Sequence, residues 1–255
     1  MKNSKNTLLL SLAIVSCTLI IAFCINDWTN DFLEAKYPKN NEGSIYVKGM
    51  GQTNFDSDLI VWEGKYSKES NNMKDAYAGI EKDKQVVYDF LLSKGIVQSE
   101  IVFGAVNTTE LNRTLYSDEG KYIGEEFLGY KMSQDVMIES KDVEKVEEVS
   151  RAITEVLNSG VRFYSYQPRY YYTKLADLKL DLISKATEDA RLRAKNISKK
   201  SGAKLGDLVS ADMGVLQIVG QNSDEEYSWG GTLNTSSKKK TASITMTLNY
   251  RVKNE

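Results

Sequence analysis

The chain has 255 residues, a formal net charge of −2, two cysteines and no histidine. Both cysteines, Cys17 and Cys24, lie in an apolar stretch near the amino terminus, so the rest of the chain has no thiol for catalysis, metal binding or a disulfide. The absence of histidine removes the commonest general base and metal ligand, and the near-neutral charge argues against a nucleic-acid surface.

The amino-terminal stretch has the pattern of an export segment. An uncharged apolar run from Leu8 to Ile25 follows Lys2 and Lys5, and its length suffices to span a bilayer with the lysine end in the cytoplasm. We favour an uncleaved signal anchor at residues 1–26, because no A-x-A-like cleavage site follows the run. The alternatives are a cleaved signal peptide and a lipoprotein signal processed before Cys17.

The next residues, 27–42, are polar and predict a short tether from the bilayer. Residues 43–255 then form the folded part, as one body or two interlocked lobes. Two runs with alternating apolar and polar residues, 44–50 and 58–66, predict strands. The intervening Gly51-Gln52-Thr53-Asn54 predicts a turn, so we expect an opening hairpin.

The remaining elements follow from periodicity and from turn residues. Helical spacing predicts three helices, and alternation predicts the strands between them. The predicted helices run from Met73 to a stop at Gly95, from a cap at Asp142 to Gly160, and from Lys174 to Ser201 with Gly202 as cap. The predicted strands are 100–112, 124–139, 161–172 with Pro168 at an edge or bulge, 205–219 and 241–252. This order predicts an α+β fold with a mainly antiparallel sheet and helices packed on one face.

Two segments carry a resemblance to a known family. The opening strand places Val47, Gly49 and Gly51 in a V-x-G-x-G pattern. The late helix carries spaced alanines, Ala186, Ala190 and Ala194, and its exit carries Gly202 and then the pair Leu205-Gly206. In their order and separation they resemble the SIMPL family of exported bacterial proteins, over roughly residues 44–252. A loop at residues 117–124 and an insertion containing Trp229 depart from the family pattern.

The resemblance implies a setting rather than a chemistry. Members of the family are periplasmic or envelope proteins, some are associated with stress tolerance, and some assemble into ring- or channel-like oligomers. No catalytic residues of the family can be carried over to this chain. The resemblance therefore supports an expectation about the fold of this chain more strongly than one about its function.

Aromatic and basic residues supply the candidate surface. Tyr164, Tyr166 and Arg169 lie in the tyrosine-rich strand, and Trp229 lies in the polar loop before the last strand. Such side chains can stack a carbohydrate, a peptidoglycan fragment or a partner side chain. The alternative is that one side of the tyrosine strand fills the core and the other covers a subunit interface. The basic run Lys238-Lys239-Lys240 predicts a solvated strand edge.

These observations favour a non-enzymatic protein anchored in the inner membrane, with its folded part in the periplasm or cell envelope, or secreted to the periplasm if cleaved. We expect it to act through self-association or through contacts with other envelope proteins, with no cofactor, no metal and no nucleic acid. The alternative is a binding module that holds a small envelope ligand on the aromatic surface.

Overall fold

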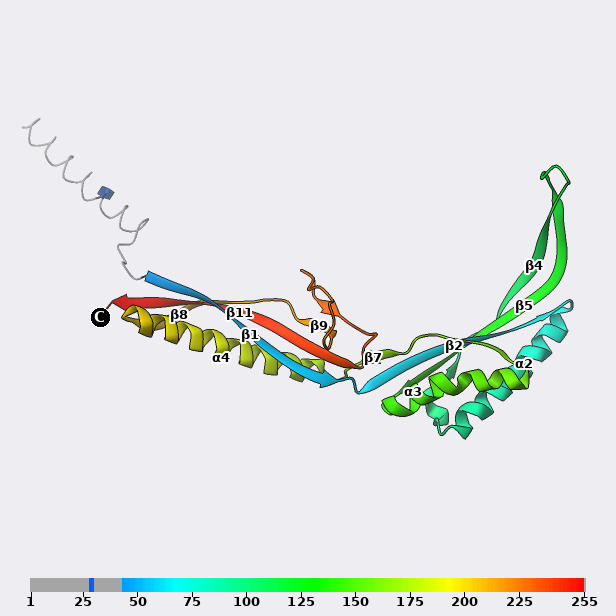
Figure 1. The fold of residues 1–255 in the computed structure, drawn as a ribbon, viewed down its shortest axis with the longest axis horizontal. Helices are drawn as coiled ribbons and strands as arrows, with labels where there is room; N and C mark the ends of the chain where they lie inside the picture. Colours follow the sequence, from blue (N-terminus) through cyan, green and yellow to red (C-terminus); the bar gives the residue numbers. More distant parts are fainter. Residues whose placement is uncertain (1–27, 30–42, 255) are drawn as a thin grey trace, which may run out of the picture. The chain divides into compact units, whose positions relative to one another are not determined.

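A computed structural model describes residues 28–29 and 43–254 of the chain (Figure 1). The signal anchor expected at residues 1–26 lies outside the described residues, as does nearly all of the tether expected at 27–42, so both remain predictions. Within the described ranges, no helix combines the length and the apolar character needed to cross a membrane.

The described residues form an α+β fold with two mostly antiparallel sheets and three α-helices. The helices are α2 (Met73–Ser93), α3 (Val143–Ala152) and α4 (Leu175–Ser201), and 3₁₀ turns lie at η1 (Gln98–Glu100) and η2 (Ile153–Ser159). The strands are β1 (Gly43–Asp56), β2 (Leu59–Ser70), β3 (Ile101–Phe103), β4 (Asn107–Tyr116), β5 (Tyr122–Ser140), β6 (Arg162–Ser165), β7 (Arg169–Tyr171), β8 (Ala203–Met213), β9 (Gln217–Gly220), β10 (Thr232–Leu233) and β11 (Lys239–Asn254). The predicted α+β class with mainly antiparallel pairing is therefore confirmed for this part of the chain, but the strands form two sheets where one was expected.

One sheet, here called the helix-pair sheet, has the order β3-β5-β2-β6, with β4 also paired to β5 and β7 to β2. Helices α2 and α3 lie along the same side of β2 and β5 (Figure 1). Their apolar faces share one buried cluster with alternate residues of β2, including Ile60, Trp62 and Tyr66. Because successive side chains of a strand point to opposite faces, one face of β2 lies in the core.

Aromatic rings fill the centre of this core. Phe163 of β6 stacks between Trp62 and Tyr66, with ring centroids 5.9 and 6.4 Å away. Gly64 lies between those two residues on β2, and a side chain there would collide with the ring of Phe163. The glycine thus makes room for an aromatic side chain from the neighbouring strand.

The second sheet, here called the long-helix sheet, has the order β1-β11-β9-β10, with β8 also paired to β11. Gly49 and Gly51 of β1 lie directly against α4. A Cβ at Gly51 would collide with Leu182 O and lie 2.9 Å from Ala186 N, and a Cβ at Gly49 would lie 2.8 Å from Ala190 Cα. The small residues on both elements bring strand and helix backbones into close contact.

The predicted opening hairpin is wrong. Residues 51–54 continue β1, which pairs with β11, whereas β2 pairs with β5, β6 and β7. The physical reason is that Gly49 and Gly51 serve close packing under α4, so glycine here marks an approaching helix and not a turn.

The predicted helix ends are confirmed, whereas three predicted strands each divide in two: 100–112 into β3 and β4, 161–172 into β6 and β7, and 205–219 into β8 and β9. Gly95, Gly160 and Gly202 follow helical segments with φ of +84°, +78° and +73°, the left-handed conformation expected of a helix-ending glycine. Asn72 caps α2 by accepting from the amides of Lys74 and Asp75. Pro168 falls in the gap between β6 and β7, where no ladder hydrogen bond is lost.

The chain divides into two compact units. The larger unit consists of Val47–Arg193 and Ser210–Leu248, and it contains the helix-pair sheet and the contacts of Gly49 and Gly51 with α4. The described part of the smaller unit includes residues 43–46, 194–209 and 249–254, which are the start of β1, the end of α4, most of β8 and the end of β11.

Candidate functional site

A pocket of about 400 Å³ lies on the long-helix sheet, within the larger unit. Lys48 and Met50 line it, and because they alternate with Gly49 and Gly51 they lie on the strand face that points away from α4. The remaining lining includes Val215, Tyr227 and Trp229. We call this space the Trp229 pocket.

Hydrogen bonds hold the loop that carries Trp229. The side chain of Gln217 on β9 donates to Ser228 O at 2.7 Å and accepts from Ser228 N at 3.2 Å. Ser243 Oγ of β11 donates to Tyr227 Oη at 3.2 Å. Upstream, Glu225 accepts from Gly220 N at 2.9 Å. These contacts hold the loop before Trp229, and the pairing of Thr232 on β10 with Gln217 on β9 holds the backbone after it, although Trp229 itself is 100% exposed.

A second pocket, of about 280 Å³, contains two of the other predicted residues. Tyr166 and Arg169 line it together with Gln167, Val61 and Glu63. Arg169 forms an ion pair with Glu63 across the β7–β2 ladder. The guanidinium group is thus partly neutralised by the protein itself.

The four predicted surface residues do not form one surface. Tyr166 and Arg169 line one pocket and Trp229 lines another. Tyr164, on β6, lines neither and is half exposed. Two aromatic residues of the tyrosine-rich segment, Phe163 and Tyr170, pack against the buried core cluster, so part of the segment fills the core, as the alternative interpretation proposed.

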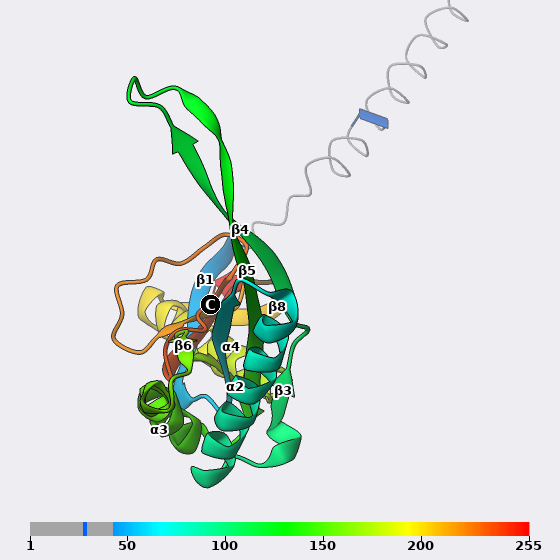
Figure 2. The same cartoon turned by 90° about the vertical axis from the view of Figure 1, so that its right-hand side faces the viewer.

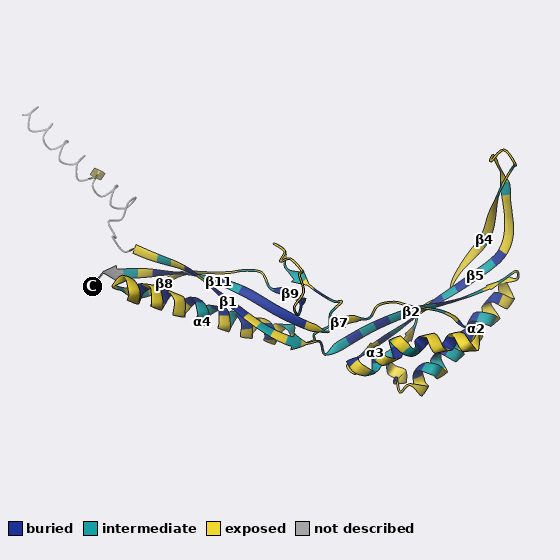
Figure 3. Cartoon of the chain, in the orientation of Figure 1, coloured by how far each residue is buried: buried dark blue, intermediate teal, exposed yellow. Residues whose placement is uncertain are grey.

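A long hairpin extends from the helix-pair sheet. Strand β2 pairs with β5 only as far as Tyr130, so residues 111–129 are paired between β4 and β5 alone, and we call them the β4–β5 arm. Figure 2 shows the arm running past the rest of its sheet, and Figure 3 shows most of it as exposed. Five large apolar side chains of the arm are 45–63% exposed: Tyr116, Tyr122, Ile123, Phe127 and Leu128.

The arm bends at glycines and bulges. The β4–β5 register shifts at Leu111/Asn112 and again at Leu115/Tyr116. At the base of the arm Gly129 has φ +136°, and a Cβ there would lie 2.5 Å from Ser70 O at the end of β2. The outer edge of β4 has no strand partner among the described residues. Exposed apolar residues beside an open strand edge are typical of association surfaces.

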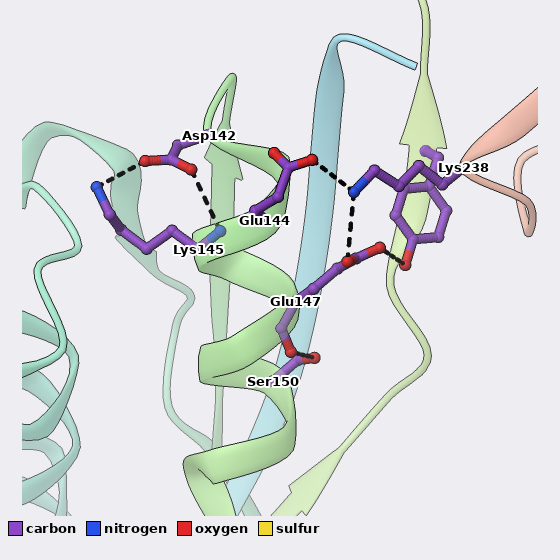
Figure 4. A network of polar contacts seen from close by, with 7 residues as sticks. Asp142, Glu144, Lys145, Glu147, Ser150 and Lys238 are labelled. Atoms are coloured by element: carbon purple, nitrogen blue, oxygen red, sulfur yellow. Dashed lines mark hydrogen bonds and ion pairs between the residues drawn. The ribbon is translucent and has the colours of Figure 1, made fainter. Parts of the chain in front are cut away.

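Charged residues link α3 to the start of β11 (Figure 4). Lys238 Nζ lies 2.7 Å from Glu144 Oε1 and 3.5 Å from Glu147 Oε2. Tyr170 Oη donates to Glu147 at 2.8 Å, and burial together with this bond raises the pKa of Tyr170 to about 12. Hydrogen bonding to Lys238 lowers the pKa of Glu144.

The predicted solvated edge at Lys238-Lys239-Lys240 is wrong for Lys240. Its side chain is 1% exposed, and its ammonium group donates to Asn234 O at 2.7 Å, to Asn234 Oδ1 at 3.2 Å and to Ser237 O. Burial lowers the pKa of Lys240 to about 8. The lysine is thus an internal anchor for the loop before β11, because it satisfies carbonyl groups that the turn leaves unpaired.

Sequence reasoning missed the other walls of the Trp229 pocket. Lys48 and Met50 carry no motif, and their position becomes apparent only when Gly49 and Gly51 are placed against α4. Among residues 28–29 and 43–254, no group of three or more Cys, His, Asp or Glu side chains is placed to hold a metal ion.

Comparison with known proteins supports the resemblance drawn from the sequence. No curated protein matches the chain significantly. A family model, described as SIMPL, protein of unknown function (DUF541), matches residues 45–252. The match covers both glycines under α4, both sheets and all three described helices. The chain therefore belongs to the SIMPL family.

Proposed function

We propose that this chain is a membrane-anchored protein of the bacterial cell envelope that acts without catalysis, through self-association or contacts with other envelope proteins. The observation that carries the proposal is the β4–β5 arm. It presents five large apolar side chains and an open β4 edge, and neither helix α2 nor α3 forms a shared core with it.

The energetics favour covering the arm. Burying apolar surface contributes roughly 25 cal/mol per Å², so a few half-exposed aromatic and aliphatic side chains supply several kcal/mol towards association. An open strand edge adds backbone hydrogen bonds when another strand pairs with it. The export segment expected at residues 1–26 and the role in stress tolerance associated with the family fit an envelope protein that works through such contacts.

The test compares two triple variants of the full chain, extracted from membranes in mild detergent. In the arm variant, Tyr116, Tyr122 and Phe127 are replaced by serine. In the matched control, the equally exposed Tyr77, Leu180 and Leu192 on helices α2 and α4 are replaced by serine. We expect the arm variant alone to lose higher-order species in light scattering and in envelope crosslinking.

The proposal fails if the unmodified chain stays monomeric at high concentration and crosslinks to no envelope protein. It also fails if both variants behave alike. Sequencing the amino terminus of the extracted protein tests the anchor separately, because a retained anchor leaves the start of the chain intact.

A further inference from the structure

The Trp229 pocket has the construction of a small-molecule site. Its volume of about 400 Å³ falls within the range of ligand pockets, which are mostly apolar with a few placed polar groups. Met50 and Val215 supply apolar surface, whereas Ser243 and Thr245 supply hydroxyl groups from β11.

The loop that carries Tyr227 and Trp229 is ordered beside this pocket, which costs conformational entropy. A fully exposed tryptophan on a fixed loop gains nothing from burial in the fold. The loop is nevertheless anchored before Trp229 by Gln217, Glu225 and Ser243, and after it by the pairing of β10 with β9. Because ordering a loop costs conformational entropy, an exposed indole on an anchored backbone is best explained by a planar group that stacks on it.

The pocket also has an uncompensated positive charge. Lys48 lines the pocket, and no described residue forms an ion pair or hydrogen bond with its ammonium group. This distinguishes it from Arg169 in the second pocket, which is paired with Glu63. No acidic side chain lines the Trp229 pocket, so the ligand itself is the available counter-charge.

We propose that the Trp229 pocket binds a small aromatic carboxylate, whose ring stacks on Trp229 and Tyr227 and whose carboxylate pairs with Lys48. This inference is independent of the proposed association through the β4–β5 arm, because the two surfaces share no residue.

The experiment is calorimetric titration of the full-length protein in detergent with three probes of similar size: 2-naphthoate, the neutral 2-naphthylmethanol, and decanoate. We expect 2-naphthoate to bind at least fivefold more tightly than either of the others. Equal affinity for the alcohol would overturn the role of Lys48, and equal affinity for decanoate would overturn the aromatic class.

Variants locate the site. Lys48→Met should lower the affinity for 2-naphthoate about tenfold, the change expected for about 1.4 kcal/mol, and Trp229→Ala should lower it at least as much. Lys141→Met, which removes an exposed lysine outside the pocket, should leave binding unchanged. Unfolding midpoints without ligand confirm that each variant is folded. Wild-type affinity in either pocket variant would refute the proposal.

Discussion

The two sheets bury their helices by opposite means. The helix-pair sheet uses volume: Trp62, Tyr66 and Ile60 of β2 are fully buried beneath α2 and α3. In the long-helix sheet, β1 uses the absence of volume, because Gly49 and Gly51 lie against Ala186 and Ala190 of α4, while β11 of the same sheet carries large buried side chains such as Ile244 and Leu248. Large and small residues can therefore both indicate tight packing. The packing of β2 is most sensitive to truncation of a large side chain, and the packing of β1 is most sensitive to the addition of one.

Truncating the centre of the helix-pair sheet should give the largest effect. Trp62→Ala removes a fully buried ring that stacks on Phe163 and donates to Ser165 Oγ at 3.0 Å. We expect a loss of about 3–5 kcal/mol in the free energy of unfolding, measured by urea titration. Trp229→Ala is the matched control, because that ring is fully exposed; a similar loss in both variants would contradict the packing described here.

Adding a single methyl group should be the next most damaging change, in the other sheet. Gly51→Ala places a Cβ against backbone atoms of Leu182 and Ala186, which cannot move without shifting α4. We expect a loss of about 3 kcal/mol, the upper end of the usual range for overpacking. Gly43→Ala is the control on the same strand, since a Cβ there meets no atom within 4 Å. If Gly51→Ala is as stable as Gly43→Ala, β1 and α4 are not in close contact.

The contrast between the sheets also explains what the sequence could predict. Periodicity and capping residues identified α2, α3 and α4, because the signals at Gly95, Asp142 and Gly202 are local. The role of Gly49 and Gly51 could not be read locally, since a turn and a close approach to a distant helix both require glycine. The same limit hid the burial of Lys240, whose partners Asn234 and Ser237 are supplied by a loop with no regular pattern.

Of the candidate site, the sequence identified Trp229 but not its surroundings. Grouping it with Tyr164, Tyr166 and Arg169 assumed one surface, whereas the sheet pairing places them on different pockets or on none. Lys48 and Met50 are remote from Trp229 in the sequence and adjoin it only through the β1–β11 pairing. Predicting a site that is built from several strands requires the order of those strands in the sheet, and hydrophobic periodicity does not give that order.

A smaller effect is expected from substituting Gly79, a glycine inside helix α2. Gly79 of α2 leaves space for Lys68, whose Cγ would lie 2.8 Å from an added Cβ and whose Nζ lies 3.2 Å from the buried carboxylate of Asp83. Alanine should gain about 1 kcal/mol in helix propensity but displace Lys68, so Gly79→Ala alone should be close to neutral.

A double-mutant cycle resolves these opposing terms. In a Lys68→Ala background the added methyl meets no long side chain, so Gly79→Ala should then stabilise the fold by about 1 kcal/mol. Urea unfolding of the four proteins gives the coupling energy. Equal effects of Gly79→Ala in both backgrounds would show that the space needed by Lys68 is not the reason for a glycine at position 79.

The smallest expected effect concerns the edge of the long-helix sheet, and it depends on pH. Asp189 of α4 accepts from Met50 N at 2.9 Å, so it occupies a backbone donor on the outer side of β1. This bond and Arg193 lower the pKa of Asp189 below its usual 3.8. The folded state therefore binds this proton less readily than the unfolded chain, and the stabilisation is present above pH 3.8 and disappears as pH falls through the lowered pKa.

Asp189→Asn keeps an acceptor for Met50 N but cannot titrate. The variant should be slightly less stable than the wild type at pH 7, and the difference should shrink as the pH is lowered from 4 to 2. Asp181→Asn, which removes an exposed ion pair with Lys185 on the same helix, is the control without a backbone partner on β1. A difference between wild type and Asp189→Asn that stays constant with pH would show that the charge of Asp189 does not protect this strand edge, and that its hydrogen bond alone does so.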